Sequence, residues 1–167
     1  MTQCTFQNAR VWRLGADVDT DALAPGAYMK HGLEVIGWHC LEAVRTDFAS
    51  GIREGDVIVA GANFGIGSSR EQAAGVLRHL GLAAVIAPSF SGLYFRNAFN
   101  VGLLLLTCPE AHRIEEGERV GLAFEGDTPW VLRAKGQRLA CAPIPDFLMD
   151  RIDAGGLLSL LKQRKPA

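Results

Sequence analysis

Between residues 56 and 107 the hydrophobic positions form three short apolar segments, separated by two stretches with helical spacing. The apolar segments are bounded by Gly or Pro, which is typical of buried strands, and lie at 56–60, 83–87 and 103–107. The stretches between them predict one helix from about residue 69 to 80, ended by Gly81, and another over 91–100, ended by Gly102. A strand–helix–strand–helix–strand order predicts parallel strands joined by right-handed crossovers.

The flanking regions have weaker patterns. Residues 9–14 predict a short strand, a polar acidic loop follows at 15–21, and a helical stretch is expected around 33–44. After Pro109 the pattern changes to short β-like segments with turn residues between them, which predict additional hairpins at 118–124, 130–134 and 137–142. Residues 145–162 have helical spacing that two adjacent glycines interrupt. We therefore expect an α/β fold in one domain over residues 1–167.

The composition and charge give no support for nucleic-acid binding, membrane association or secretion. Of the 167 residues 49% are hydrophobic and 21% are charged, the usual balance of a globular chain. The formal net charge of −1 gives no electrostatic reason to expect a nucleic acid or an anionic membrane as partner. The N-terminal residues lack the pattern of a signal peptide, and the longest aliphatic run, residues 103–106, is far too short to span a bilayer. We expect a cytoplasmic protein.

The four cysteines, at positions 4, 40, 108 and 141, are widely separated, so no CxxC-type metal or redox motif is present. We expect unlinked and mostly buried thiols. Ligation of an iron–sulfur cluster usually takes several thiolates at close spacing. The sequence therefore predicts no metal site on this chain and no cluster held by this chain alone.

A glycine-rich loop with the sequence Gly-Ala-Asn-Phe-Gly-Ile-Gly, residues 61–67, joins a predicted strand to a predicted helix. Loops at the carboxyl end of a strand are where α/β proteins bind ligands, and a helix N-terminus behind such a loop favours an anion. Gly65 and Gly67 can let the backbone turn sharply and approach a ligand closely. The loop matches neither a Walker motif, which needs Gly-Lys-Ser/Thr, nor a dinucleotide fingerprint, which needs glycine where Arg70 stands.

Two interpretations of the residues after this loop compete. Ser68 and Glu71 match a capping box, in which both side chains only satisfy backbone N–H groups at the start of the helix. Against this, an arginine at position 70 would lie in the first helical turn and oppose the helix dipole, at a cost of about 0.3–1 kcal/mol. A residue that violates a local preference is a candidate for function. Arg70 could bind a carboxylate through two parallel hydrogen bonds.

The stretch Asn-Phe-Gly-Ile-Gly-Ser-Ser-Arg-Glu, residues 63–71, closely resembles the signature of the aconitase swivel domain. The chain is most similar to the separate small subunits of that family, those of 3-isopropylmalate dehydratase and homoaconitase. Further blocks look like family blocks, occur in the family's order and cover roughly residues 10–107; they lie at 17–26, 55–61, 84–90 and 95–103. The resemblance implies a swivelling β/β/α domain like the aconitase C-terminal domain.

The resemblance also implies roles for individual residues. Ser68 would be the base that removes a proton from the carbon beside a substrate carboxylate, while Ser69 and Arg70 would bind substrate carboxylate. Asp21, in the Asp-Thr-Asp loop, matches an acidic residue near the family's active site and is expected among the substrate-binding residues. The implied reaction is dehydration and rehydration of a hydroxy-diacid, most simply the isomerisation of 2-isopropylmalate to 3-isopropylmalate in leucine biosynthesis. The 4Fe–4S cluster and its cysteines would belong to a large-subunit partner, so this chain would be inactive alone.

The sequence departs from the family pattern in the segment that, in the family, recognises the variable arm of the substrate. The family commonly has a Tyr-Leu-Arg-Thr-like stretch, whereas this chain has Tyr-Met-Lys-His at 28–31. Lys30 keeps a positive charge without the planar fork and could accept a further carboxylate, or it could extend along the surface. The alternative substrates are therefore homocitrate, a methylmalate-type compound, dimethylmalate and a tricarboxylate. A non-catalytic anion-binding module on the same fold is the alternative from another class.

Overall fold

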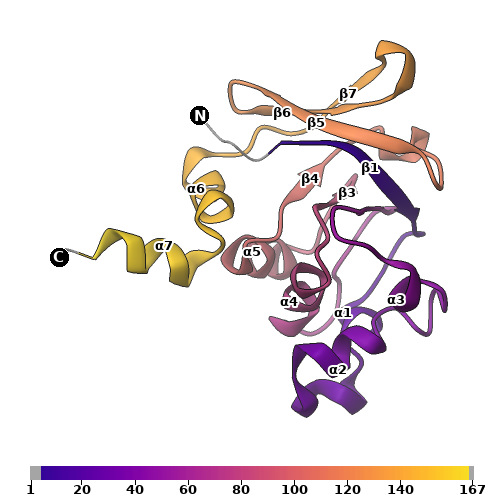
Figure 1. Cartoon of the computed structure of the whole chain (residues 1–167), viewed down its shortest axis with the longest axis vertical. Helices are drawn as coiled ribbons and strands as arrows, with labels where there is room; N and C mark the ends of the chain where they lie inside the picture. Colours follow the sequence, from indigo (N-terminus) through magenta and orange to yellow (C-terminus); the bar gives the residue numbers. More distant parts are fainter. Residues whose placement is uncertain (1–4, 166–167) are drawn as a thin grey trace.

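The computed structural model describes residues 5–165 and is organised around one seven-stranded mixed sheet with strand order β4-β3-β2-β1-β5-β6-β7 (Figure 1). The strands are β1 Phe6–Arg13, β2 Val57–Val59, β3 Ala84–Ala87, β4 Leu105–Thr107, β5 Arg119–Glu125, β6 Thr128–Leu132 and β7 Arg138–Ala140. In Figure 1 the antiparallel strands β5–β7 lie at the top, and helices α1, α2, α4 and α5 lie below.

The parallel half of the sheet confirms the predicted strand–helix–strand order. Strands β2, β3 and β4 pair in parallel register, and β1 pairs with β2 in the same direction. Every residue of β2 and β3 is buried, which explains why these segments are continuously apolar rather than alternating. Strand β1 begins at Phe6, earlier than the predicted residue 9, because Phe6 pairs with Leu122 beyond an irregularity at Asn8, whose φ is +58°.

The helices form the crossovers and the C-terminal end of the described chain. Longer helices are α2 Gly32–Trp38, α4 Gln72–His79, α5 Gly92–Val101, α6 Asp146–Ala154 and α7 Leu157–Arg164. Single turns are α1 Thr20–Leu23, α3 Phe48–Gly51 and the 3₁₀ segments η1 Gly26–His31, η2 Ala111–Arg113 and η3 Ala134–Gly136. As predicted, adjacent glycines at 155 and 156 separate α6 from α7, and both have positive φ. None of the helices among residues 5–165 is long and apolar enough to cross a membrane.

The helix expected around 33–44 is shorter than predicted. Helix α2 ends at Trp38, and the chain then turns through Leu41, which has φ +61°. Leu41 is fully buried, and its N–H donates to the carbonyl of Ala22 at 2.8 Å. This tertiary contact draws the chain out of helical geometry, and it overrides the apolar periodicity that suggested a longer helix.

The region after residue 109 forms the predicted hairpins. Strands β5, β6 and β7 pair antiparallel in sequence order, with Ala123 opposite Trp130 and Val131 opposite Leu139. After β7 the chain returns to the other edge of the sheet, where Ala142 N–H donates to the carbonyl of Thr107 at 2.8 Å. The last residue of β4 and the residues after β7 are therefore neighbours, although β4 and β7 are the two edge strands.

Candidate active site

The loops that follow β1, β2 and β3 are hydrogen-bonded to one another at the carboxyl edge of the parallel strands. Gly65 N–H donates to Val18 O at 2.7 Å, and Thr20 N–H donates to Ile66 O at 2.8 Å. On the other side, Phe64 N–H donates to Ser89 O at 3.2 Å. The glycine-rich loop after β2 is thus held between its two neighbours, at the position where open α/β sheets bind ligands.

Glycine is required at two positions of this loop. Gly65 has φ +85°, and a Cβ there would lie 2.2 Å from Cγ of Tyr94, whose ring is buried beneath the loop. Gly67 has φ +105°, and a Cβ there would lie 3.1 Å from Oγ1 of Thr20. Both residues adopt the left-handed region that L side chains disfavour. The loop therefore packs directly onto α5 on one side and α1 on the other.

Ser68 and Ser69 follow the second of these glycines and are exposed to solvent. Neither hydroxyl makes a hydrogen bond to another residue of the described chain. The segment that carries them runs beside the loop after β1, because Ile66 bonds to Thr20 before the serines and Arg70 bonds to Asp21 after them. Two free hydroxyls are thus presented at the carboxyl edge of the sheet on a segment that is fixed at both ends.

The side chain of Arg70 turns back to the loop after β1. Its Nη1 donates to Oδ1 of Asp21 at 3.0 Å and to the carbonyl of Ala24 at 2.9 Å. Within the described residues Nε and Nη2 donate to no other group. These two nitrogens form one edge of the planar guanidinium, the edge that can grip a carboxylate through two parallel hydrogen bonds.

Asp21 is held in its charged form by two donors. Its Oδ1 accepts the N–H of Gly26 at 3.0 Å as well as Nη1 of Arg70. The hydrogen bond from Gly26, followed by the one from Arg70, lowers the pKa of Asp21 below its ordinary value. Because its carboxylate already pairs with Arg70, the contact fixes the direction of the guanidinium. The side chain of Asp21 is 69% exposed, so the ion pair itself adds little to stability.

The helix behind the loop begins later than predicted. Helix α4 starts at Gln72, its N-cap is Glu71, and no side chain caps it, so the capping box of Ser68 and Glu71 is not formed. Arg70 N–H instead bonds to Ser68 O at 2.9 Å, a tight turn that delays the first helical hydrogen bonds. The expectation that Arg70 opposes the dipole from within the first helical turn was therefore wrong, because Arg70 lies before the helix and is engaged by Asp21 and Ala24.

Lys30 lies at the end of η1, is exposed, and makes no ion pair with another residue of the described chain. The segment that carries it is anchored through Tyr28, whose ring stacks on His39 with centroids 3.7 Å apart. His39 in turn has Nδ1 2.7 Å from Oε2 of Glu42. The ammonium of Lys30 is thus available for an anion, on a short helix that α2 supports.

The donor side chains within the described residues do not fit a metal cluster. Among residues 5–165 there is no group of three or more His, Cys, Asp or Glu side chains that could hold a metal ion. The described cysteines, Cys40, Cys108 and Cys141, are free and buried.

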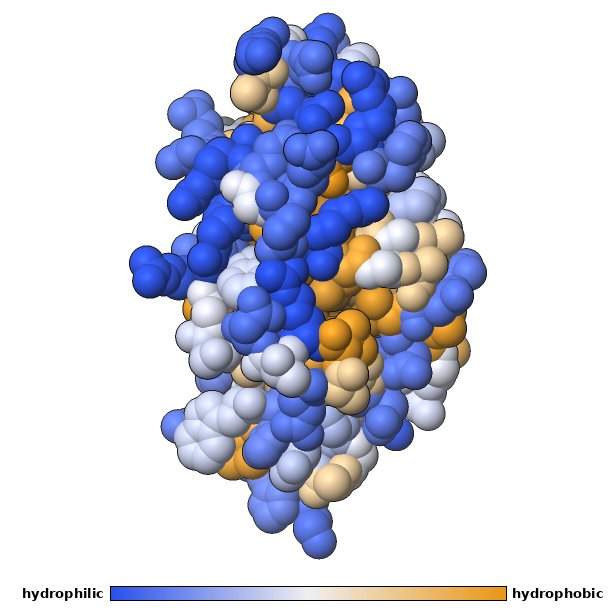
Figure 2. Space-filling model, turned by 90° about the vertical axis from the view of Figure 1, so that its right-hand side faces the viewer, coloured by the Kyte–Doolittle hydropathy of each residue, from blue (hydrophilic) through white to orange (hydrophobic). Residues whose placement is uncertain are grey.

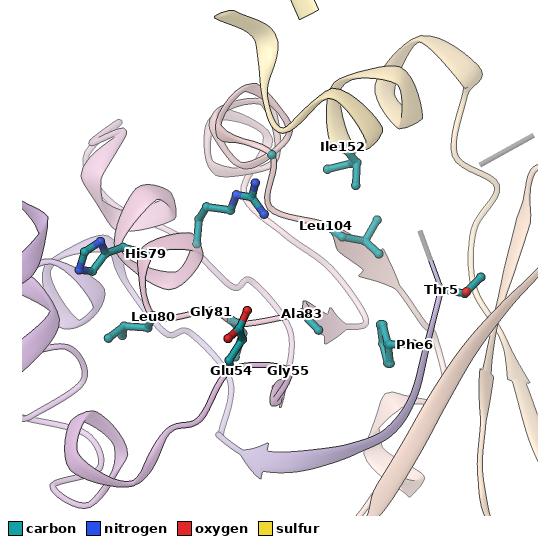
Figure 3. Close-up of a pocket in the computed structure, with 13 residues that line it drawn as sticks. Thr5, Phe6, Glu54, Gly55, His79, Leu80, Gly81, Ala83, Leu104 and Ile152 are labelled. Atoms are coloured by element: carbon teal, nitrogen blue, oxygen red, sulfur yellow. The ribbon is translucent and has the colours of Figure 1, made fainter. Parts of the chain in front are cut away.

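Figure 3 shows a cavity of about 580 Å³ at the opposite edge of the sheet. Its lining includes Glu54 and Gly55 before β2, Gly81 to Ala83 before β3, and Leu104 before β4, so it lies at the amino ends of the parallel strands. The serines and Arg70 follow the carboxyl end of β2, which separates this cavity from them. β1 ends on the side of the molecule that Figure 2 shows, where hydrophobic residues gather near the middle of a largely hydrophilic face.

Several residues that support the site carry no signal in the sequence. The carbonyl of Ala24 and the N–H of Gly26 are backbone groups, so no residue type marks them. Tyr94 supports Gly65 and donates its hydroxyl to Ala73 O at 3.0 Å, but an aromatic residue in an apolar helix is ordinary core. His39 has no partner at metal-ligand spacing, and its stacking on Tyr28 depends on the turn that follows α2.

Comparison with known proteins gives consistent matches. Residues 46–111 match the family model described as the aconitase C-terminal domain. The chain is 40% identical over 154 residues to 3-isopropylmalate dehydratase small subunit 1 of Archaeoglobus fulgidus, covering 92% of this chain and 95% of the relative. It is 40% identical over 152 residues to the methanogen homoaconitase small subunit of Methanothermobacter thermautotrophicus, covering 90% and 87%. A crystal structure of 3-isopropylmalate dehydratase from Methanocaldococcus jannaschii superimposes with a TM-score of 0.87 at 36% identity, over 96% of this chain and 95% of that one.

Proposed function

The chain belongs to the family of aconitase-related small subunits that includes those of 3-isopropylmalate dehydratase, and we propose that it contributes Ser68 and Arg70 to a two-subunit hydro-lyase. The substrate class is a hydroxy-diacid, and 3-isopropylmalate is the first candidate because several relatives carry that dehydratase name. The partner is a large subunit, as the small-subunit names of the relatives imply.

The observation that carries this proposal is the orientation of Arg70. Asp21 and Ala24 engage Nη1, and the Nε–Nη2 edge remains without a partner among the described residues. An arginine held in this way is prepared for a carboxylate, because less conformational freedom is lost when the ligand binds. Ser69 lies next to Arg70 and supplies a hydroxyl that can donate to the same carboxylate.

Ser68 is the residue that we assign to proton transfer. Proton abstraction beside a carboxylate needs a base within hydrogen-bonding reach of that carbon, and a bound carboxylate on Arg70 would bring the carbon to the serines. A serine hydroxyl is a poor base unless its oxyanion is stabilised, and the guanidinium two residues on is the nearest cationic group in the sequence. Ser68 would take the proton in one direction and return it in the other.

The departing hydroxyl needs a Lewis acid, which we propose that the partner supplies. A 4Fe–4S cluster on the large subunit would act as a Lewis acid toward that hydroxyl. The hydrophobic area near the middle of the face in Figure 2 suits burial against such a partner, since exposed apolar patches commonly mark interfaces. The site on this chain would then be closed by the partner rather than by this chain.

Lys30 favours a second candidate substrate class. Its ammonium is exposed and makes no ion pair within residues 5–165, so it could accept an additional carboxylate of a homocitrate-like tricarboxylate. The homoaconitase small subunit among the relatives shows that the family includes such a named enzyme. Methylmalate-type and dimethylmalate substrates lack that third carboxylate.

The test is anaerobic co-expression with the cluster-bearing large subunit of the same organism, followed by assay on a panel of hydroxy-diacids and tricarboxylates. We expect turnover of 3-isopropylmalate by the pair and none by this chain alone. Faster turnover of a tricarboxylate would move the assignment to the second class. An active pair whose rate does not change with Ser68→Ala would show that this chain is a non-catalytic anion-binding module.

A further inference from the structure

We propose that Cys108 and Cys141 form a reversible disulfide when a peroxide oxidises them. This disulfide would link the two edges of the seven-stranded sheet. Cys108 directly follows β4 and Cys141 directly follows β7, the two edge strands. The site is independent of the proposed function, because neither cysteine belongs to the serine–arginine loop.

The backbone fixes both cysteines at the point where the edges meet. Ala142 N–H donates to Thr107 O at 2.8 Å, so residues next to both cysteines are already hydrogen-bonded to each other. On the outer sides, Cys108 N–H donates to Ala87 O and Cys141 N–H donates to Pro129 O, each at 2.9 Å. The chain is thus held on both sides of the pair, and the two thiols lie close enough for each to shift the pKa of the other.

The pair differs from the third described cysteine. Cys108 is fully buried and Cys141 is 4% exposed, and both are free thiols. The neighbouring thiol lowers the pKa of Cys108 and raises the pKa of Cys141, so Cys108 is the thiol of the pair that loses its proton more readily. Burial raises the pKa of Cys40, which meets no other thiol within residues 5–165. Since thiolates react with oxidants and thiols do not, Cys108 is the reactive residue.

The chemistry balances with hydrogen peroxide as the oxidant. The Cys108 thiolate attacks one peroxide oxygen, so that an S–O bond forms, the O–O bond breaks and the leaving hydroxide takes up a proton as water. The Cys141 sulfur then attacks the Cys108 sulfur, so that the S–S bond forms and the S–O bond breaks. The hydroxyl leaves as water with the proton from Cys141. Two thiols lose two electrons, and one peroxide is reduced to two waters.

A small oxidant suits this position. Cys141 is 4% exposed and lies at the start of residues 141–145, which form neither helix nor strand, so a small oxidant needs only local opening of this segment to reach the pair. Cys108 follows the carboxyl end of β4, the same edge of the sheet that carries the loops after β1 and β2. The disulfide would therefore lock the edge from which the candidate active site is built.

The test is peptide mapping of the full chain after treatment with hydrogen peroxide and alkylation of the remaining thiols. Trypsin releases Cys108 in residues 97–113 and Cys141 in residues 139–151. We expect these two peptides to be joined, at about 2 Da below their summed mass for the two hydrogens lost, and to separate after dithiothreitol. The peptide of residues 31–45, which carries Cys40, should remain single and is the internal control.

Variants and a thermal measurement give the second readout. Peroxide should raise the unfolding midpoint of the wild type, because a cross-link restricts the unfolded chain, and dithiothreitol should reverse the rise. Cys141→Ser should abolish the rise and leave Cys108 over-oxidised, whereas Cys40→Ser should behave like the wild type. The proposal is overturned if Cys108 and Cys141 are each recovered alkylated, if Cys108 becomes sulfinic or sulfonic acid in the wild type, or if it links to a different cysteine.

Discussion

Arg70 and Asp21 are 49 positions apart in the sequence, yet Nη1 of the arginine lies 3.0 Å from Oδ1 of the aspartate. The contact joins the loop after β2 to the loop after β1, and the carbonyl of Ala24 gives the guanidinium a second fixed point. The orientation of the guanidinium that we assign to carboxylate binding thus depends on a segment far away in the chain. Asp21 is accordingly a positioning residue.

Asp21→Ala should raise KM more than it lowers kcat. The guanidinium would keep only its bond to Ala24, so its free edge would be less well oriented for the substrate. We expect KM to rise about tenfold, equivalent to about 1.4 kcal/mol. Asp21→Asn, which retains an oxygen acceptor, is the matched control and should lie between the variant and the wild type. Steady-state kinetics of the reconstituted pair measure both constants; a collapse of kcat at constant KM would mean that Asp21 takes part in the chemistry.

Gly65→Ala should disrupt the loop. The added methyl would lie 2.2 Å from the buried ring of Tyr94 in a backbone with φ +85°, so it adds both a clash and strain. We expect a loss of about 2 kcal/mol or more in the free energy of unfolding, measured by urea denaturation. Gly92→Ala is the control, because nothing lies within 4 Å of a Cβ at that position. Equal stability of the two variants would contradict the packing of the loop on α5.

The parts of the fold that depend on local pattern were predictable from the sequence. Strands β2 and β3 are buried on both faces, so their residues are uniformly apolar and their positions were correct to within one residue at each end. The ends of α2 and α4 depend on contacts between distant residues. Leu41 bonds to Ala22, and Arg70 bonds to Asp21, and each contact replaces helical geometry that the local spacing favoured.

In the candidate site, too, features of the local sequence were predictable and contacts between distant residues were not. The loop, its glycines and Arg70 stand out as a motif because residues 63–71 resemble the family signature. The conflict of Arg70 with the helix dipole, which also singled it out, is not present, since Arg70 lies before α4. The main-chain partners in the site could not be predicted in the same way, since Ala24 offers a backbone carbonyl to Arg70 and Gly26 donates a backbone N–H to Asp21. Sequence reasoning finds unusual side chains, whereas main-chain groups become visible only in the folded structure.

Asp56 should make the stability depend on acid pH. It is 5% exposed, and its Oδ2 accepts from Arg10, Trp12 and the N–H of Arg53 at 2.7, 2.8 and 2.9 Å. Burial alone would raise the pKa of Asp56, but these hydrogen bonds together lower it below the ordinary value of 3.8. A lowered native pKa means that the carboxylate stabilises the fold above about pH 4 and that this contribution is lost as the pH falls through the native pKa.

Asp56→Asn tests this directly. At pH 7 we expect it to lose about 2–3 kcal/mol in the free energy of unfolding, since the hydrogen bonds involve a charged acceptor. The difference from the wild type should shrink as the pH is lowered from 5 toward 2, measured by denaturant titration at each pH. Asp127→Asn, at an exposed position, is the control and should stay close to the wild type throughout. A difference that grew with acidity would contradict the lowered pKa.

Lys30 should affect the choice of substrate rather than the rate of the chemical step. If the ammonium accepts a third carboxylate, Lys30→Ala will lower kcat/KM for a tricarboxylate about tenfold or more and change that for 3-isopropylmalate less. Lys162→Ala, at an exposed lysine of α7, is the control. Equal losses for both substrate classes would show that Lys30 serves structure or assembly instead.

The most direct measurement compares Ser68→Ala with Ser69→Ala in the anaerobically reconstituted two-subunit enzyme. If Ser68 is the base, its variant should bind the large subunit normally and lose at least about a thousandfold in kcat, while Ser69→Ala should mainly raise KM. Solvent hydrogen exchange at the substrate carbon, followed by NMR, should disappear only in Ser68→Ala. Persistence of that exchange, with kcat within a few-fold of the wild type, would contradict the assignment.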